Sequence, residues 1–226
     1  MTAGRKRLRK PLGEDGGVSP LGAVMCIVLL FALAFAVDLG AAFATAQRQN
    51  SDLQIARETV QQTGNEFVLK NTANLEGSLS RKIADALQEQ GYDGTVNVYV
   101  LAKSRATAAN DEEERKLGQD KCVAAYTVLL YSECDTYFAR LFGIEKIPIK
   151  TTLTGSAVYY SSGTTKAQGT WADGALYYVN PGEKGRYWKS DDLVLPSMGA
   201  LEKAETLSKM KDATANAASE RIASLK

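Results

Sequence analysis

The apolar run from Val18 to Val37 constrains this chain more than any other feature of its sequence, because its 20 residues include no charged side chain. At ~1.5 Å of rise per residue, a helix of this length spans about 30 Å, the thickness of the hydrocarbon core of a bilayer. The run therefore predicts a transmembrane helix over residues 18–38, preceded by a tail over residues 1–17.

The charges on either side of the run indicate its orientation. Five cationic side chains lie shortly before it, at Arg5, Lys6, Arg7, Arg9 and Lys10. Asp38 follows the run directly, and the next cation is Arg48. By the positive-inside rule, the N-terminal tail stays in the cytoplasm and everything after Asp38 is exported. We therefore expect a single-pass protein of the cell membrane with an extracytoplasmic C-terminal domain.

A cleaved secretory signal is the alternative interpretation of the same segment. Ala34-Phe35-Ala36 forms an A-x-A motif after a basic stretch and an apolar stretch, as a signal-peptidase site requires. The apolar run is longer than the usual core of a signal peptide, and the helical pattern continues beyond the motif, so a retained anchor is favoured. In both interpretations the remainder of the chain lies outside the cytoplasm.

The composition argues against several classes of function. The chain has 226 residues, a formal net charge of +1 and no histidine. A balanced charge argues against a nucleic-acid partner. The lack of histidine removes the commonest general base and the commonest neutral metal ligand. Because no phosphate-binding loop, zinc spacing or nucleophile elbow is present either, we expect no enzymatic activity and no cofactor or metal.

The exported part carries the signals of an α+β domain. We expect a membrane-proximal helix over residues 39–71, a head over 72–195 and a C-terminal helix over 196–226. Within the head, the apolar pattern predicts helices over 74–90 and 135–142, strands over 95–102, 123–131 and 147–160, and a hairpin or extended loop over 171–188. Together these elements predict one antiparallel or mixed sheet with helices on one side.

Two of the three cysteines, Cys122 and Cys134, flank a predicted strand of the exported domain, where disulfides persist. A turn at Ser132-Glu133 would bring them together, and closing the short loop would add roughly 2–3 kcal/mol of stability. Nine extended residues between them would instead hold the pair too far apart for a Cα separation of ~5.5 Å. The compartment favours the disulfide. Cys26 lies in the apolar run and is expected to behave as a small hydrophobic residue.

One local concentration of aromatic side chains is a candidate ligand-facing surface, suited to a sugar ring or an extended peptide. Its members are Trp171, Tyr177, Tyr178, Tyr187 and Trp188. Aromatic residues at strand ends more often pack in a core or at its rim. If the surface binds a ligand, the chain is a membrane-anchored extracytoplasmic binding module for a cell-wall polymer or peptide.

The boundary of the apolar run, Val37-Asp38-Leu39-Gly40, followed by Gln49-Asn50-Ser51-Asp52, resembles the N-terminal region of TadE/TadG-like proteins. The segment from Tyr137 to Ile144 resembles a more distal segment of the same family. These are minor, pseudopilin-like components of the tight-adherence (Flp) pilus and secretion machinery. The resemblance implies a structural or assembly component that meets other pilus or secretion subunits through its transmembrane helix. The candidate assembly contacts are Asp38, Gly40, Gln49, Asn50 and Asp52.

The chain departs from the pattern of pseudopilins that a prepilin peptidase cleaves. Such proteins have a glycine before the cut and usually a glutamate at the fifth position after it. Here the fifth residue after Gly17 is Gly22, and the fifth after Gly16 is Leu21. We therefore expect a permanent anchor rather than a processed pilin tail.

Overall fold

The computed structural model describes residues 20–62, 75–92, 94–119, 121–160, 175–179, 187–196 and 198–225. In chain order the helices and strands are α1 (Pro20–Gln61), α3 (Leu75–Glu89), β1 (Thr95–Ser104), α4 (Asp111–Leu117), β2 (Lys121–Asp135), β3 (Lys146–Tyr160), β4 (Ala175–Val179), β5 (Tyr187–Ser190) and α5 (Ala200–Ala223). Two short 3₁₀ turns, η1 (Arg105–Thr107) and η2 (Ala139–Phe142), lie between strands.

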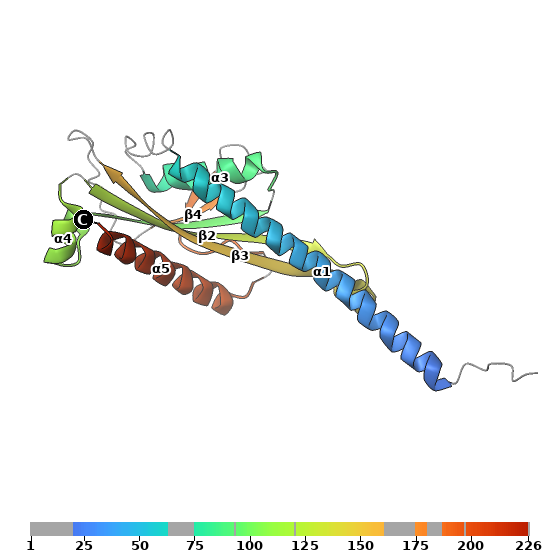
Figure 1. Cartoon of the computed structure of the whole chain (residues 1–226). Helices are drawn as coiled ribbons and strands as arrows, with labels where there is room; N and C mark the ends of the chain where they lie inside the picture. The colour runs from blue at the N-terminus through green and yellow to red at the C-terminus, as the bar shows by residue number, and fades with distance from the viewer. Residues whose placement is uncertain are drawn as a thin grey trace, which may run out of the picture.

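Helix α1 is continuous over 42 residues and joins the expected transmembrane helix to the expected membrane-proximal helix. Its only proline is Pro20, in the first turn, where the missing N–H has no helical partner to lose. The N-terminal part of α1 extends away from the rest of the molecule, and the C-terminal part lies along the sheet (Figure 1). The expected continuation of this helix to residue 71 falls on residues 63–74, which lie outside the described residues.

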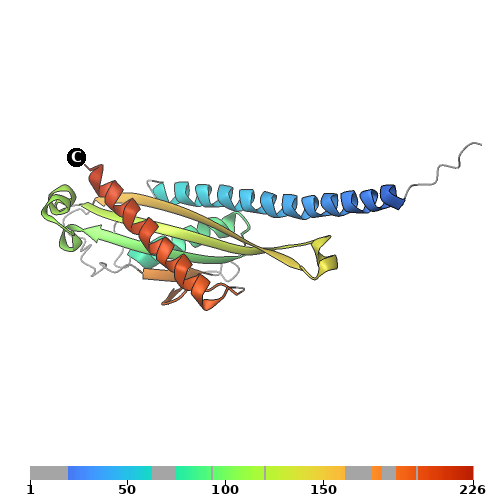
Figure 2. The same cartoon turned by 90° about the horizontal axis from the view of Figure 1, so that it is seen from below.

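The strands form one antiparallel sheet in the order β3-β2-β1-β4-β5, which confirms the α+β class. Strands β2 and β3 make a long hairpin, in register from Lys121 opposite Tyr160 to Asp135 opposite Lys146. Each of these two strands has 15 residues, against 10 in β1. The end of the hairpin therefore extends beyond the rest of the sheet, alongside α1 (Figure 2).

Helices cover both faces of the sheet, so the prediction of helices on one side is wrong. Leu53 of α1 and Leu79 of α3 share one buried cluster with Val98 of β1. Met210 of α5 shares a second cluster with Leu129 of β2, on the opposite face. The physical reason lies in the central strands, where seven of the ten residues of β1 and nine of the first ten of β2 are buried. A strand that is apolar toward both sides needs a cover on each.

The predicted disulfide between Cys122 and Cys134 is wrong, and all three cysteines are free thiols. The expected turn at Ser132-Glu133 is absent from this described stretch, because β2 runs straight through it to Asp135. Twelve residues of extended strand, at ~3.3 Å each, hold the two cysteines roughly 40 Å apart. That is far beyond the ~5.5 Å between Cα atoms that a disulfide requires.

Candidate membrane-facing site

The N-terminal part of α1, from Pro20 to Val37, presents large apolar side chains in every direction. Those with fractional exposures between 46% and 72% are Leu21, Val24, Met25, Ile27, Val28, Leu29, Leu30, Phe31, Leu33, Phe35 and Val37. None of the most apolar 18-residue stretch of the helix is buried against the head, and its mean hydropathy is 2.6. By length and composition this part of the helix is consistent with a single-pass membrane anchor.

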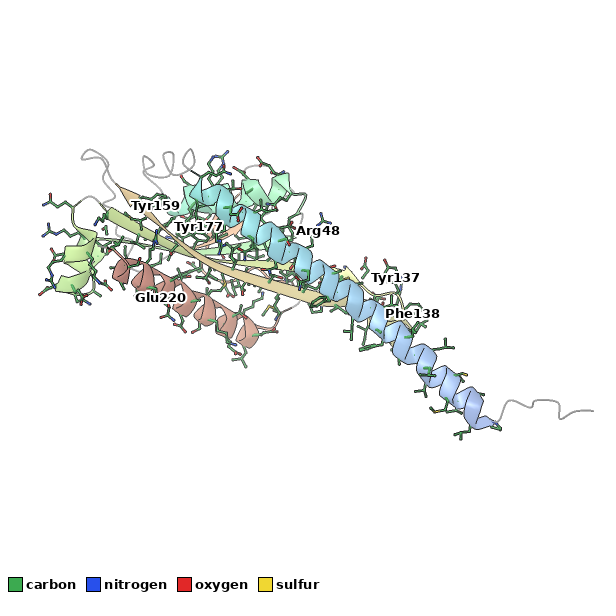
Figure 3. All side chains as sticks on the ribbon, in the orientation of Figure 1. Arg48, Tyr137, Phe138, Tyr159, Tyr177 and Glu220 are labelled. Atoms are coloured by element: carbon green, nitrogen blue, oxygen red, sulfur yellow. The ribbon has the colours of Figure 1, made fainter. Side chains whose placement is uncertain are left out.

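The turn between β2 and β3, residues 136–145, lies beside this exposed part of α1, and we call it the hairpin tip. The ring of Phe142 in the tip meets the ring of Phe31 in α1 edge to face, with centroids 5.5 Å apart and an interplanar angle of 61°. An apolar groove of about 660 Å³ runs between the two elements, lined by Val28, Phe35, Phe138 and Leu141 among others. In Figure 3, Tyr137 and Phe138 lie next to α1, well away from Tyr159 and Tyr177.

Asp38 fixes the hairpin tip to the helix. Its Oδ1 accepts a hydrogen bond from the backbone N–H of Tyr137 (2.7 Å), and its Oδ2 accepts from those of Phe138 (3.0 Å) and Ala139 (2.6 Å). The side chain is only 1% exposed. These N–H groups lie at the start of η2, where a helical turn leaves donors without internal partners. A carboxylate that accepts several backbone N–H bonds makes stronger contacts than a neutral acceptor would.

The hairpin tip is closed by its own hydrogen bonds. The backbone N–H of Thr136 donates to the carbonyl of Glu145 (3.0 Å), and its hydroxyl donates to the carbonyls of Ile144 and Glu145. The N–H of Ile144 donates to the carbonyl of Ala139 (3.1 Å). Gly143 ends η2 with φ +82°, a conformation that L side chains rarely adopt. The expected helix over 135–142 is thus reduced to the single turn Ala139–Phe142, because β2 continues to Asp135.

The predicted assembly contacts further along α1 have different surroundings. Gln49 is 3% exposed; its amide nitrogen donates to Ser132 Oγ (2.5 Å) and its oxygen accepts from Thr151 Oγ1 (2.8 Å). Asp38 and Gln49 therefore hold α1 to the chain's own hairpin. Gly40 and Asn50 are exposed.

Asp52 is 9% exposed on the side of α1 that faces the head. Burial raises the pKa of its carboxyl, and the positive charge of Arg48 partly offsets that rise. Of the five predicted contacts, only Gly40 and Asn50 are exposed for contacts with another molecule.

The predicted aromatic surface is divided between the two faces of the sheet. Tyr178 stacks on the half-exposed ring of Trp188, with centroids 5.5 Å apart and an interplanar angle of 17°. Tyr177 is buried, and because side chains alternate along a strand it points to the opposite face. Trp171 and the side chain of Tyr187 lie outside the described residues. Among the described members of the predicted set, the structure brings together Tyr178 and Trp188.

Sequence reasoning did not identify the hairpin tip as a neighbour of the apolar helix. A signal was present, because a turn between two strands is usually polar and this one is rich in large apolar residues. Its exposed members are Tyr137 (72%), Phe138 (42%), Leu141 (78%), Phe142 (66%) and Ile144 (47%). Five such side chains in a ten-residue turn indicate a surface that is covered in the working state of the protein.

Within the described residues, no group of three or more Cys, Asp or Glu side chains converges as a metal site would require. The features of the site are therefore an exposed apolar helix, an apolar turn beside it and a buried carboxylate that links them. Comparisons with protein-family models, with curated proteins and with solved structures found no match to this chain.

Proposed function

We propose that this chain is a single-span, TadE/TadG-like structural or assembly component of a tight-adherence (Flp) pilus or a related secretion apparatus. The observation that carries the proposal is the division of α1. One continuous helix has an N-terminal part that is exposed and apolar all round and a C-terminal part that packs on the head. A helix of this kind anchors a folded head in a membrane and offers its apolar part to other membrane helices.

The small residues within the apolar part support a role in helix association. Gly22, Ala23, Ala32, Ala34 and Ala36 leave room for close approach of a second helix, which is the usual basis of helix pairing in lipid. Five cations precede the span and Asp38 follows it, so the positive-inside rule leaves the N-terminus in the cytoplasm and the head outside.

The alternative function, an anchored binding module for a cell-wall polymer or peptide, rests on the stacked pair Tyr178 and Trp188. Of the three predicted aromatic side chains that the structure describes, Tyr177 is buried, so two remain to face a ligand. The assembly function therefore has the stronger support.

Site-specific photo-crosslinking in the native cells tests the proposal. A photo-reactive residue at Leu33, 68% exposed in the apolar part, is expected to form adducts with transmembrane helices of pilus or secretion subunits. The matched control is Ile55, 49% exposed on the head-bound part of the same helix and outside the span. If Leu33 and its neighbour Leu29 form adducts with lipid alone while the protein remains in the membrane, the assembly function is wrong. Release of the protein by alkaline carbonate would contradict the anchor itself.

A further inference from the structure

We propose that the hairpin tip is a second membrane contact, which places Phe138, Leu141 and Phe142 among the acyl chains of the outer leaflet beside α1. The inference rests on the proposed membrane span and assigns a lipid-facing role to a part of the head. On this proposal the head is held to the bilayer at two points: helix α1 crosses the bilayer, and the hairpin tip enters its outer leaflet from outside.

The first argument is the level of the tip along α1. Phe142 contacts Phe31, which precedes Asp38 by seven residues, or about 10 Å along the helix axis. Apolar side chains continue around α1 on both sides of that level, from Val28 to Phe35. A bilayer that covers this part of the helix therefore also reaches the turn that lies against it (Figure 2).

The second argument is that several polar backbone groups of the tip have hydrogen-bond partners within the chain. Asp38 accepts from three successive N–H groups, and Thr136 bonds to the carbonyls of Ile144 and Glu145. Irregular backbone is costly in hydrocarbon when its N–H and C=O groups lack partners. Pairing these groups within the chain lowers the cost of bringing the apolar side chains of the tip into the acyl region.

The third argument is the placement of the polar side chains around the tip. Tyr137 is 72% exposed, and tyrosine is enriched at the level of the lipid headgroups. Arg140 is exposed, and its long stem allows the guanidinium to reach a phosphate while the neighbouring apolar side chains remain in the acyl region. Lys146 pairs with Glu133 (2.9 Å) where β2 and β3 join the tip, on the side of the tip that faces the head.

Continuity with α1 favours lipid over a protein as the occupant of this surface. The membrane that surrounds the helix is already present at the level of the tip, so lipid needs no additional partner to reach it. A second copy of the chain, or another subunit, would have to displace that lipid, and this is the competing outcome in the test.

Depth measurement on the full chain in liposomes of phosphatidylethanolamine and phosphatidylglycerol tests the proposal. The background carries Cys26→Ala and Cys134→Ser. Cys122 is retained, because it is 4% exposed and burial raises the pKa of its thiol to about 11, which keeps it unreactive at neutral pH. The background alone must take up no nitroxide label. Single labels are then placed through Leu141→Cys in the tip, Leu30→Cys in the span and Leu201→Cys on α5.

Leu141 and Leu201 are matched leucines, 78% and 86% exposed, and Leu30 reports on the span itself. The depth of each nitroxide label is measured from its collisions with two quenchers: oxygen, which concentrates in lipid, and a charged nickel chelate, which stays in water. We expect a several-fold higher ratio of oxygen to nickel collisions at Leu141 than at Leu201, and a high ratio at Leu30. A high ratio at Leu30 with a low one at Leu141 overturns the lipid contact and leaves the span intact.

Three further outcomes also overturn the inference. Shielding of Leu141 from both quenchers means that protein covers the tip. A low ratio at Leu30 means that the span is wrong, and the lipid contact fails with it. Equally high ratios at Leu141 and Leu201 mean that the head meets lipid without selectivity for the tip.

Discussion

The two parts of α1 share one helix and differ in how their apolar side chains are arranged around it. From Pro20 to Val37 the apolar residues lie on all sides and none of the large ones is buried. From Asp38 to Gln61 the buried apolar residues follow one stripe, formed by Leu53, Ala56 and Val60, each no more than 1% exposed, while Leu39, Phe43 and Ile55 lie exposed off that stripe. Apolar content alone therefore does not decide which part of a helix enters a protein core. A stripe fits one packed face, whereas an all-round apolar surface fits lipid or a bundle of other helices.

The two parts meet at Asp38, and the hairpin tip reaches past this residue along the exposed part. The head therefore holds α1 on both sides of the boundary, through Gln49 in one part and through Phe31 in the other. A helix that left the head as a free stalk would allow the head to swivel. Contacts on both sides hold the helix and the head in a fixed relative orientation at this point.

The largest expected effect is a difference between two identical substitutions on the same helix. Leu53→Ala removes a side chain that is 0% exposed and packed in the cluster between α1, α3 and the sheet. We expect the free energy of unfolding of the head to fall by about 2–5 kcal/mol, since the substitution leaves a cavity. Leu30→Ala, at a position 68% exposed in the apolar part, should change it by less than about 0.5 kcal/mol.

Urea unfolding of the full chain in detergent micelles, followed by the tryptophan fluorescence of the head, measures both values. Equal losses from the two variants would mean that the apolar part contributes to the fold of the head. A negligible loss from Leu53→Ala would mean that the C-terminal part of α1 does not support the sheet.

The second expected effect concerns the junction. Asp38→Ala removes the acceptor of the N–H groups of Tyr137, Phe138 and Ala139. A donor left without a partner costs about 1–3 kcal/mol, so the tip should open more often than in the unmodified chain. Hydrogen exchange at these three amides should accelerate by an order of magnitude or more, while exchange in α3 stays unchanged.

Two variants control this measurement. Asn50→Ala alters an exposed polar residue of the same helix and should leave exchange at the tip unchanged. Asp38→Asn retains one acceptor oxygen and should give an intermediate rate. Unchanged exchange in Asp38→Ala would show that apolar contact with α1, and not the carboxylate, holds the tip in place.

The helix, the sheet and the α+β class could be predicted from sequence because they follow from local patterns: an uncharged run of one membrane thickness and alternating strands. The position of the tip could not, since the contact between Phe31 and Phe142 joins residues that are distant in the sequence. The disulfide prediction failed for a related reason. The positions of two cysteines beside a predicted strand do not reveal where the strand ends. Strand β2 continues for four residues beyond Tyr131, the predicted end, and so runs through the expected turn at Ser132-Glu133.

The candidate site also has a part that the sequence could predict and a part that it could not. Asp38 and Gln49 were candidate contacts because the segments around them resemble the TadE/TadG-like pattern, but the resemblance implied contacts with other subunits. Their partners in the structure are donors and acceptors of the β2–β3 hairpin, which only the tertiary structure identifies. Tyr177 and Tyr178 are neighbours in sequence and were predicted to share a surface. Their alternation along β4 sends them to opposite faces, and the role of each is decided by what covers that face.

The smallest expected effect compares the two buried carboxylates of α1. Asp38 has three N–H donors, whereas burial raises the pKa of Asp52 above its ordinary value and Arg48 offsets the rise only in part. A carboxyl whose pKa is higher in the folded than in the unfolded state stabilises the fold below its unfolded pKa, and that stability is lost as pH rises through its folded pKa.

Asp52→Asn should therefore stabilise the head slightly at neutral pH, with the gain disappearing at acid pH. Urea unfolding across this pH range measures the difference, with Asp191→Asn, the same substitution at an exposed site, as the control. If the Asp52→Asn variant were less stable than the unmodified chain at neutral pH, the fold would hold the charged form of Asp52 as firmly as that of Asp38.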